Sequence, residues 1–187
     1  MNNKLVVGLA GMPGAGKSVV VNVARGAGYG VVVMGDIVRD EAERKGMKPT
    51  PENFGKIMLE LRQKKGNNVI AKSCIPKIEK AKEQKVIVDG IRSPSEVEEF
   101  KKHFLKFSLI SIHSSPETRF KRLYHRQRRD DPENWEIFHE RDMRELSVGL
   151  GNAIAMAEYL IVNEEEREVV KEKIRKVLRK VEEKWMK

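Results

Sequence analysis

Cysteine is almost absent from this chain. Its 187 residues include one, Cys74, so no disulfide can form within the chain and no cluster of thiolates can hold a metal. The four histidines lack the spacing of a zinc site, with one another or with Cys74; they are His103, His113, His125 and His139. A lone thiol suits a reducing compartment, and Cys74 is expected to be a small buried side chain.

Long hydrophobic runs are also missing. No stretch approaches the roughly 20 apolar residues of a membrane-spanning helix. The apolar run Leu5–Ala10 is too short for the hydrophobic core of a signal peptide. We therefore expect a cytoplasmic protein with no membrane partner. With 40% hydrophobic and 35% charged residues, residues 1–187 have the composition of a single globular domain.

Basic residues outnumber acidic ones and give a net charge of +9. Such an excess fits an anionic partner, either a nucleotide or a nucleic acid. It also fits the Lys- and Glu-rich surface of a heat-adapted protein, with no such partner. Because bulk charge is a weak guide to partners, local clusters carry more information than the sum.

Five apolar segments alternate with helical patterns. The predicted strands are Lys4–Ala10, Gly30–Met34, Lys85–Asp89, Phe107–His113 and Tyr159–Asn163. Helices are predicted over 17–27, 36–45, 51–65, 68–84, 95–103, 116–129, most of 133–157, and 164–185. This alternation predicts an α/β protein with a three-layer α/β/α fold and a five-stranded parallel sheet. Right-handed crossovers then bring the loops that follow the strands to one edge of the sheet.

A glycine-rich segment joins the first strand to the first helix. It reads Gly11-Met12-Pro13-Gly14-Ala15-Gly16-Lys17-Ser18, a complete G-x-x-x-x-G-K-S phosphate-binding loop. Glycines let the backbone wrap closely around phosphate oxygens, and the following helix adds its positive N-terminal end. Lys17 would reach the β- and γ-phosphates, and the Ser18 hydroxyl would bind Mg²⁺. The sequence therefore predicts ATP and Mg²⁺ as cofactors of a P-loop NTPase fold.

The classes of P-loop protein can be narrowed by what is missing. GTPases read guanine with an N-K-x-D motif, which this chain lacks, since Asn163 is followed by three glutamates. Motor ATPases and helicases usually have longer chains with more motifs. A short chain with five strands and an arginine-rich late helix points to another class of P-loop protein.

Two later segments resemble nucleoside monophosphate kinases such as adenylate, CMP and UMP kinases. Gly35-Asp36-Ile37-Val38-Arg39 is similar to the G-D-x-(hydrophobic)-R segment after their second strand. The resemblance implies that Arg39 grips the acceptor phosphate and that Asp36 lies near the acceptor. Alternatively, Asp36 is only a helix N-cap, and Arg39 lies on a solvated helix face.

The second segment, Val86-Ile87-Val88-Asp89-Gly90-Ile91-Arg92, resembles an apolar strand followed by D-G-x-x-R. One residue fewer separates Gly90 from the arginine, so an acceptor-binding role for Arg92 stays open. An acid that ends a strand beside the P-loop strand can hold Mg²⁺, usually through water. Asp89 is thus a second candidate metal residue with Ser18, although an aspartate before glycine also suits a simple turn.

Arginines recur at helical spacing in the segment 116–129. Arg119, Arg122, Arg126 and Arg129 fall on one helix face, where like charges repel unless an anion binds. Together with Arg128 they resemble the lid of a nucleotide kinase, and Arg128-Arg129-Asp130-Asp131 is similar to the R-x-D-D element of CMP and UMP kinases. Arg141, Asp142 and Arg144 on the next helix could contribute. A solvated basic face or an RNA-binding surface is the alternative.

The C-terminal part resembles dephospho-CoA kinases. Leu150-Gly151-Asn152-Ala153 and the strand that ends in Asn163 match the end of that family, in which an aspartate at the position of Asp36 is the base. The rest of the dephospho-CoA signature is absent. The whole chain resembles archaeal proteins related to adenylate and dephospho-CoA kinases.

These resemblances imply a kinase that moves the γ-phosphate of ATP to a small acceptor, with a nucleotide favoured and a dephospho-CoA-type hydroxyl still possible. Lys17, Asp36, Arg126 and Arg129 would be catalytic. The segment 36–84 would bind the acceptor, and 116–146 would form the lid. An ATP-binding regulatory protein or an ATPase, in either case with RNA as a possible partner, is the alternative.

Overall fold

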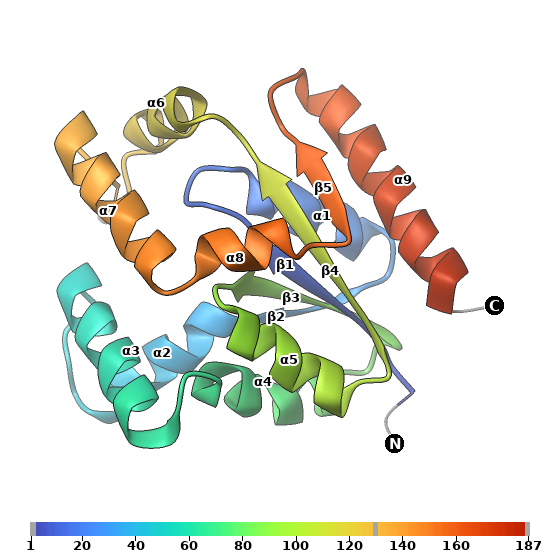
Figure 1. Cartoon of the computed structure of the whole chain (residues 1–187), viewed down its shortest axis with the longest axis horizontal. Coiled ribbons are helices and arrows are strands. Elements are labelled where there is room, and N and C mark those ends of the chain that lie inside the picture. The colour runs from blue at the N-terminus through green and yellow to red at the C-terminus, as the bar shows by residue number, and fades with distance from the viewer. Residues whose placement is uncertain (1–2, 129–130, 186–187) are drawn as a thin grey trace.

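The computed structural model describes residues 3–128 and 131–185 (Figure 1). The strands are β1 (Leu5–Ala10), β2 (Gly30–Val33), β3 (Lys85–Ile91), β4 (Lys106–His113) and β5 (Tyr159–Val162). The helices are α1 (Lys17–Gly26), α2 (Met34–Arg44), α3 (Pro51–Lys65), α4 (Val69–Lys80), α5 (Pro94–His103), α6 (Pro116–Arg126), α7 (Trp135–Ser147), α8 (Leu150–Ala155) and α9 (Arg167–Trp185).

All five strands are parallel, in the order β2-β3-β1-β4-β5. The predicted five-stranded parallel sheet is therefore confirmed. Because β1 lies between β3 and β4, the loop after β1 opens beside the ends of both neighbours. In the register, Leu9 pairs with Asp89 on β3 and with Ile110 on β4. The carboxyl end of β3 is thus placed directly beside the P-loop.

Helices cover both faces of the sheet (Figure 1). Alternate residues of β1 point to opposite faces, as a pleated strand requires. Leu5, Val7 and Leu9 pack with apolar side chains of α1 and α9. Val6 and Ala10 face the other side and pack with α4, α5 and α8. The two buried clusters hold the sheet between two helical layers, which is the predicted α/β/α arrangement.

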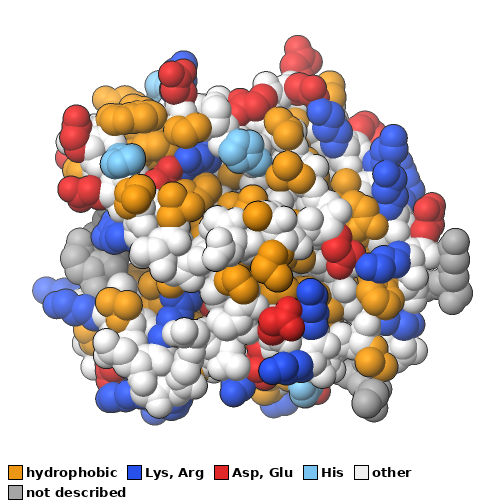
Figure 2. Space-filling model, in the orientation of Figure 1, with side chains coloured by type: hydrophobic (Ala, Val, Ile, Leu, Met, Phe, Trp, Pro, Cys, Tyr) orange, Lys and Arg blue, Asp and Glu red, His pale blue; other side chains and the backbone are white. Residues whose placement is uncertain are grey.

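An aromatic cluster joins α6 to α7 where both reach the sheet edge. The ring centroids of Phe120 lie 5.3 Å from Trp135 and 5.5 Å from Phe138. Trp135 is 43% exposed and Phe138 is 1% exposed, so the cluster runs from the surface into the core. Figure 2 shows hydrophobic side chains gathered over these two helices at upper left, and Lys and Arg along α9 at right.

Several predicted helices differ in extent from the structure. The helix predicted over 116–129 ends at Arg126, because Gln127 adopts a left-handed backbone (φ 52°). The helix predicted over most of 133–157 is divided into α7 and α8 at Gly149 (φ 100°). The one predicted over 68–84 ends at Lys80, and the following loop is held by Lys4, whose ammonium donates to two of its carbonyls.

None of the helices within residues 3–128 and 131–185 is both long and apolar enough to span a membrane.

Candidate functional site

The P-loop backbone needs glycine at two positions. Gly14 and Gly16 have φ values of 83° and 103°, a region that side chains with a Cβ rarely adopt. A Cβ at Gly16 would lie 2.2 Å from Nδ2 of Asn163, and one at Gly14 would lie 2.8 Å from the carbonyl oxygen of Arg119. Glycine is therefore required at these positions both by the backbone conformation and by the close approach of Asn163 and Arg119.

Lys17 lies at the first position of α1 and points back across the loop. Its ammonium donates to the carbonyl of Gly11 at 2.6 Å and to that of Met12 at 3.3 Å. Burial lowers the pKa of Lys17 from 10.5 to about 8, and the charge of Asp89 opposes that shift. The lysine is thus a partly desolvated cation, whose charge an incoming phosphate would stabilise.

Asp89 ends the buried part of β3 and lines the same pocket as Lys17 and Ser18. Its Oδ1 is buried and has no hydrogen-bond partner within the described part of the chain. Burial raises the pKa of Asp89, and the charges of Lys17 and Arg92 oppose this. A buried carboxylate oxygen without a donor requires one from outside the protein. A Mg²⁺ ion with its waters would supply such donors, so Ser18 and Asp89 fit the predicted metal.

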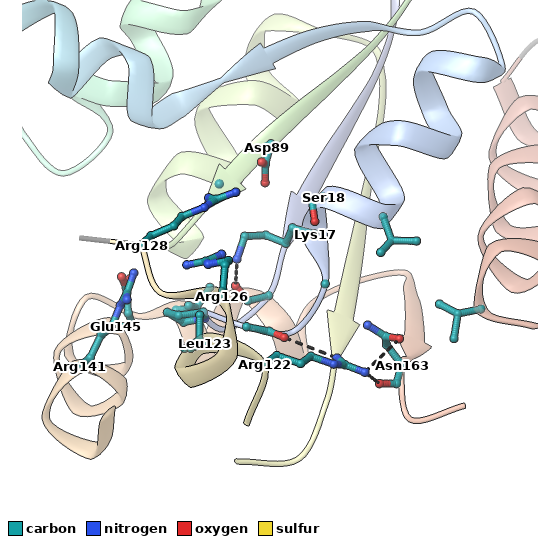
Figure 3. Close-up of a pocket in the computed structure, with 18 of the residues that line it drawn as sticks. Lys17, Ser18, Asp89, Arg122, Leu123, Arg126, Arg128, Arg141, Glu145 and Asn163 are labelled. Atoms are coloured by element: carbon teal, nitrogen blue, oxygen red, sulfur yellow. Dashed lines mark hydrogen bonds between the residues drawn. The ribbon is translucent and has the colours of Figure 1, made fainter. Parts of the chain in front are cut away.

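The pocket over the P-loop has a volume of about 570 Å³. It is lined by the P-loop, the end of β3, α6, α7 and the start of α9 (Figure 3). The basic lining residues are Lys17, Arg92, Arg122, Arg126, Arg128, Arg141 and Arg167, and the acidic ones are Asp89, Glu145 and Glu165. This excess of cations suits a ligand with several negative charges.

Arg119, predicted as a lid arginine, is buried between α6, α7 and the P-loop. Its side chain is 4% exposed, and its guanidinium donates to both carboxylate oxygens of Asp142 and to the carbonyls of Ser114 and Pro13. All of these hydrogen-bond acceptors belong to the chain itself. In this structure Arg119 therefore braces the P-loop through Pro13, and the predicted role of folding over the phosphates stays a prediction.

Arg122 also holds the loop, although it lines the pocket. It donates to Ser114 Oγ at 2.8 Å and to the Asn163 carbonyl at 2.9 Å, with a longer contact of 3.5 Å to the Gly14 carbonyl. Asn163 in turn donates through Nδ2 to the carbonyl of Ala15 at 2.8 Å. Figure 3 shows Arg122 and Asn163 meeting beside the P-loop. These contacts fix the loop, and the lid role predicted for Arg122 stays a prediction.

Arg126 and Arg128 reach the pocket from the end of α6 and the residues after it. Arg126 donates to both carboxylate oxygens of Asp131, and it lines the pocket drawn in Figure 3 together with Lys17. Arg129 lies outside the described residues. Because α6 ends at Arg126, the predicted four-arginine stripe is not continuous: its first two members hold the P-loop and its third faces the pocket.

Arg92 enters the pocket from the end of β3 and is paired there. Its NH1 lies 3.1 Å from Oε1 of Glu145 on α7, and 3.9 Å from the sulfur of Met58 on α3. The shortened D-G-x-R segment therefore does bring its arginine to the site, but with a carboxylate already bound to it.

Asp36 and Arg39 form an ion pair with each other on the first turns of α2. Their side chains are 45% and 56% exposed, and neither lines the pocket. Both lie near enough to influence the pKa of Asp89. The structure thus places these two predicted acceptor residues beside the pocket, not in its wall.

Three charged pocket residues were missed by the sequence reasoning, Glu145, Glu165 and Arg167. Glu145 stands four residues after Arg141 on the same helix, a spacing that puts both on one face. That spacing was the available signal. Of the predicted P-loop residues, Met12 and Ala15 are absent from the pocket wall, because their side chains pack into the core clusters on opposite faces of the sheet.

Solved structures share this fold. A protein called TT1252 from Thermus thermophilus superposes with a TM-score of 0.67 at 14% identity, over 95% of this chain and 97% of that one. Shikimate kinase from Bacteroides thetaiotaomicron gives 0.64 at 15% identity, over 94% and 98%. A gluconokinase from Sinorhizobium meliloti gives 0.55 at 14% identity, over 99% and 97%. At these identities the likeness shows a shared P-loop kinase fold.

Curated relatives are much more similar in sequence. A UPF0200 protein of Hyperthermus butylicus is 48% identical over 162 residues, 87% of either chain. Another, from Methanothermobacter thermautotrophicus, is 43% identical over 182 residues, 97% of this chain and 93% of the relative. Residues 10–139 also match the protein family described as an AAA domain. The chain therefore belongs to the UPF0200 proteins and to this P-loop AAA-domain family.

Proposed function

We propose that the protein is an ATP-dependent phosphotransferase that moves the γ-phosphate of ATP to a small acceptor. The single observation that carries this proposal is that Lys17 and Asp89 line one pocket near enough for the carboxylate to raise the pKa of the lysine, while the buried Oδ1 of Asp89 has no donor in the described residues. Both face a pocket with an excess of arginine. A phosphate-binding lysine beside a candidate metal carboxylate is the donor half of a phosphoryl-transfer site.

The P-loop amides and Lys17 would hold the β- and γ-phosphates. Ser18 and Asp89 would hold Mg²⁺, which when bound neutralises charge on the transferring group. Arg126 is proposed as the main cation over the γ-phosphate, with Arg128 and Arg141 beside it. Such transfers need in-line positioning and charge stabilisation rather than covalent help from the protein.

The acceptor is proposed to enter between the P-loop pocket and the helices α2 to α4, the segment 36–84. Asp36 and Arg39 lie at the near end of this segment and would meet the outer part of the acceptor. A nucleotide-like acceptor remains favoured by the resemblance to nucleotide kinases. The solved structures named as shikimate kinase and gluconokinase add polyhydroxy acids to the candidates.

The test is an acceptor screen with the purified full chain, Mg²⁺ and ATP. ADP release is measured with AMP, CMP, UMP, adenosine, uridine, dephospho-CoA, shikimate and gluconate, and each product is identified by ³¹P NMR. Lys17→Ala is the control that removes the phosphate contact. The proposal is wrong if no acceptor raises turnover above that of the control, and slow turnover independent of acceptor would favour a regulatory ATPase.

A further inference from the structure

A second carboxylate enters the phosphate pocket from α7. Glu145 lies on α7, and its side chain is 13% exposed. Oε1 lies 3.1 Å from Arg92, whereas Oε2 is buried and has no hydrogen-bond partner among the described residues. Figure 3 shows Glu145 beside Arg141 at the wall of the pocket.

A buried glutamate in this position destabilises the fold unless a donor forms a hydrogen bond to its free oxygen. A buried acceptor left without a donor costs about 1–3 kcal/mol. Glu136 and Glu140 on the same helix are exposed and carry no such cost. The ion pair with Arg92 satisfies only one of the two oxygens of Glu145. The other oxygen needs a donor from a molecule in the pocket.

Glu145 and Asp89 act on the same cation. Both raise the pKa of Lys17 and so oppose its desolvation, although they come from different elements, α7 and β3. Asp89 belongs to the strand beside the P-loop, where the metal is expected. Glu145 is bound instead to Arg92, whose NH1 also lies 3.9 Å from the sulfur of Met58 on α3, in the segment proposed to bind the acceptor.

The two arginines that the sequence assigned to an acceptor phosphate are both occupied by carboxylates. Arg92 pairs with Glu145, and Arg39 pairs with Asp36. A phosphate dianion at this point would meet a carboxylate at each arginine, and it has no proton to offer Oε2 at neutral pH. An alcohol does have one.

We propose that Glu145 accepts the hydrogen bond of the acceptor hydroxyl and is its general base, so that the substrate is an alcohol. This inference rests on the proposed phosphotransferase function. The acceptor oxygen bonds to the γ-phosphorus as the bond from that phosphorus to the bridging oxygen breaks. ADP leaves with the electron pair of that bond. The hydroxyl proton passes to Oε2 of Glu145 and then to water, and the product is a phosphate monoester.

The experiment compares Glu145→Gln with Glu140→Gln, the same substitution on an exposed position of the same helix. Gln keeps the size of the side chain and an oxygen for Arg92, but it is not a base. We expect Glu145→Gln to lower kcat with the best acceptor by about 10²-fold or more, the usual effect of losing a general base. Binding of ADP and the ADP-induced shift in Tm should stay unchanged, and Glu140→Gln should behave as wild type.

Two further readouts separate catalysis from structure. Glu145→Asp keeps the charge with a shorter reach and should retain an intermediate kcat, which also gives a measurement if the Gln variant does not fold. Asp36→Asn should raise KM rather than lower kcat.

Four outcomes overturn the assignment. A phosphoanhydride product, made only from AMP, CMP or UMP, leaves the kinase standing but contradicts the alcohol. A higher Mg²⁺ requirement in Glu145→Gln assigns this residue to the metal's waters. If Asp36→Asn loses kcat while Glu145→Gln stays active, the general base is Asp36 and not Glu145. If no acceptor at all stimulates turnover, the proposed function and this inference fail together.

Discussion

Arg119 and Asp142 form a two-point ion pair beneath the P-loop, with NH1 to Oδ1 at 2.8 Å and NH2 to Oδ2 at 2.5 Å. The guanidinium carbon also lies 5.0 Å from the ring centroid of Phe138, and NH1 donates to the Pro13 carbonyl at 3.2 Å. One arginine of α6 therefore ties α7 to the phosphate loop. Phosphate binding and packing of these helices should consequently be coupled.

Removal of one partner of this pair should destabilise the fold and weaken nucleotide binding together. We expect Asp142→Ala to lower the free energy of unfolding by about 3–5 kcal/mol, because an unpaired arginine is left buried. Urea unfolding and ADP titration measure the two effects. Arg119→Met with Asp142→Leu should recover much of the stability but not the contact to Pro13. If Asp142→Ala changes unfolding no more than Glu140→Ala on the same helix, the pair is not structural.

Asn163 should support nucleotide binding without touching the chemistry. Its Nδ2 donates to the Ala15 carbonyl at 2.8 Å, and its Oδ1 lies 3.5 Å from Arg122. Asn163→Ala leaves a buried carbonyl without its donor, at a cost of about 1–3 kcal/mol. We expect weaker ADP binding by calorimetry, with kcat at saturating ATP nearly unchanged. A large loss of kcat with normal ADP affinity would contradict this positioning role.

The parts of the site that could be predicted from sequence are those carried by local patterns. The apolar run before Gly11 and the octet after it identify strand, loop and phosphate contact within a few residues. Asp89 follows because a strand beside β1 must end at the same edge of the sheet. Helical periodicity likewise grouped Arg119, Arg122 and Arg126 on one face.

Helical periodicity could not predict whether that face of α6 points toward the pocket or packs against the P-loop and α7. The partner of Arg119 is 23 residues away on another helix, and α6 itself ends at Arg126, before the end predicted for it at residue 129. Glu145 was missed for the same reason: its role depends on Arg92, which reaches it from β3 across the pocket. Contacts between side chains of distant elements depend on the tertiary structure, so the pattern of a single sequence does not predict them.

Lys17 should make the nucleotide-free protein less stable at neutral pH than at alkaline pH. Its pKa is lowered from 10.5 to about 8 in the fold, so between these values the unfolded chain binds a proton that the folded chain does not. Stability from this group therefore rises with pH across that window. The full shift corresponds to about 3 kcal/mol.

The measurement is urea unfolding of wild type and Lys17→Met at intervals from pH 7 to 10.5. The difference in unfolding free energy between the two proteins should move in favour of wild type as pH rises. ADP should stabilise wild type and leave Lys17→Met unaffected. A difference that stays flat across the window would mean that Lys17 keeps its ordinary pKa.

Arg126 and Arg128 should separate catalysis from stability, because they differ in what else they hold. Arg126 is bonded to Asp131, whose side chain is 3% exposed, whereas for Arg128 it is the backbone N–H that donates to the same carboxylate. Arg126→Gln should therefore lower both turnover and Tm. We expect turnover to fall by about 10³-fold, the lower limit of the effect known for arginine fingers. Arg128→Gln should lower turnover by about tenfold, one charged hydrogen bond, at unchanged Tm. Lys121→Gln is the matched control, because Lys121 is exposed on α6 and lies outside the pocket wall. Equal turnover in all three variants would show that neither Arg126 nor Arg128 stabilises the transferred phosphate.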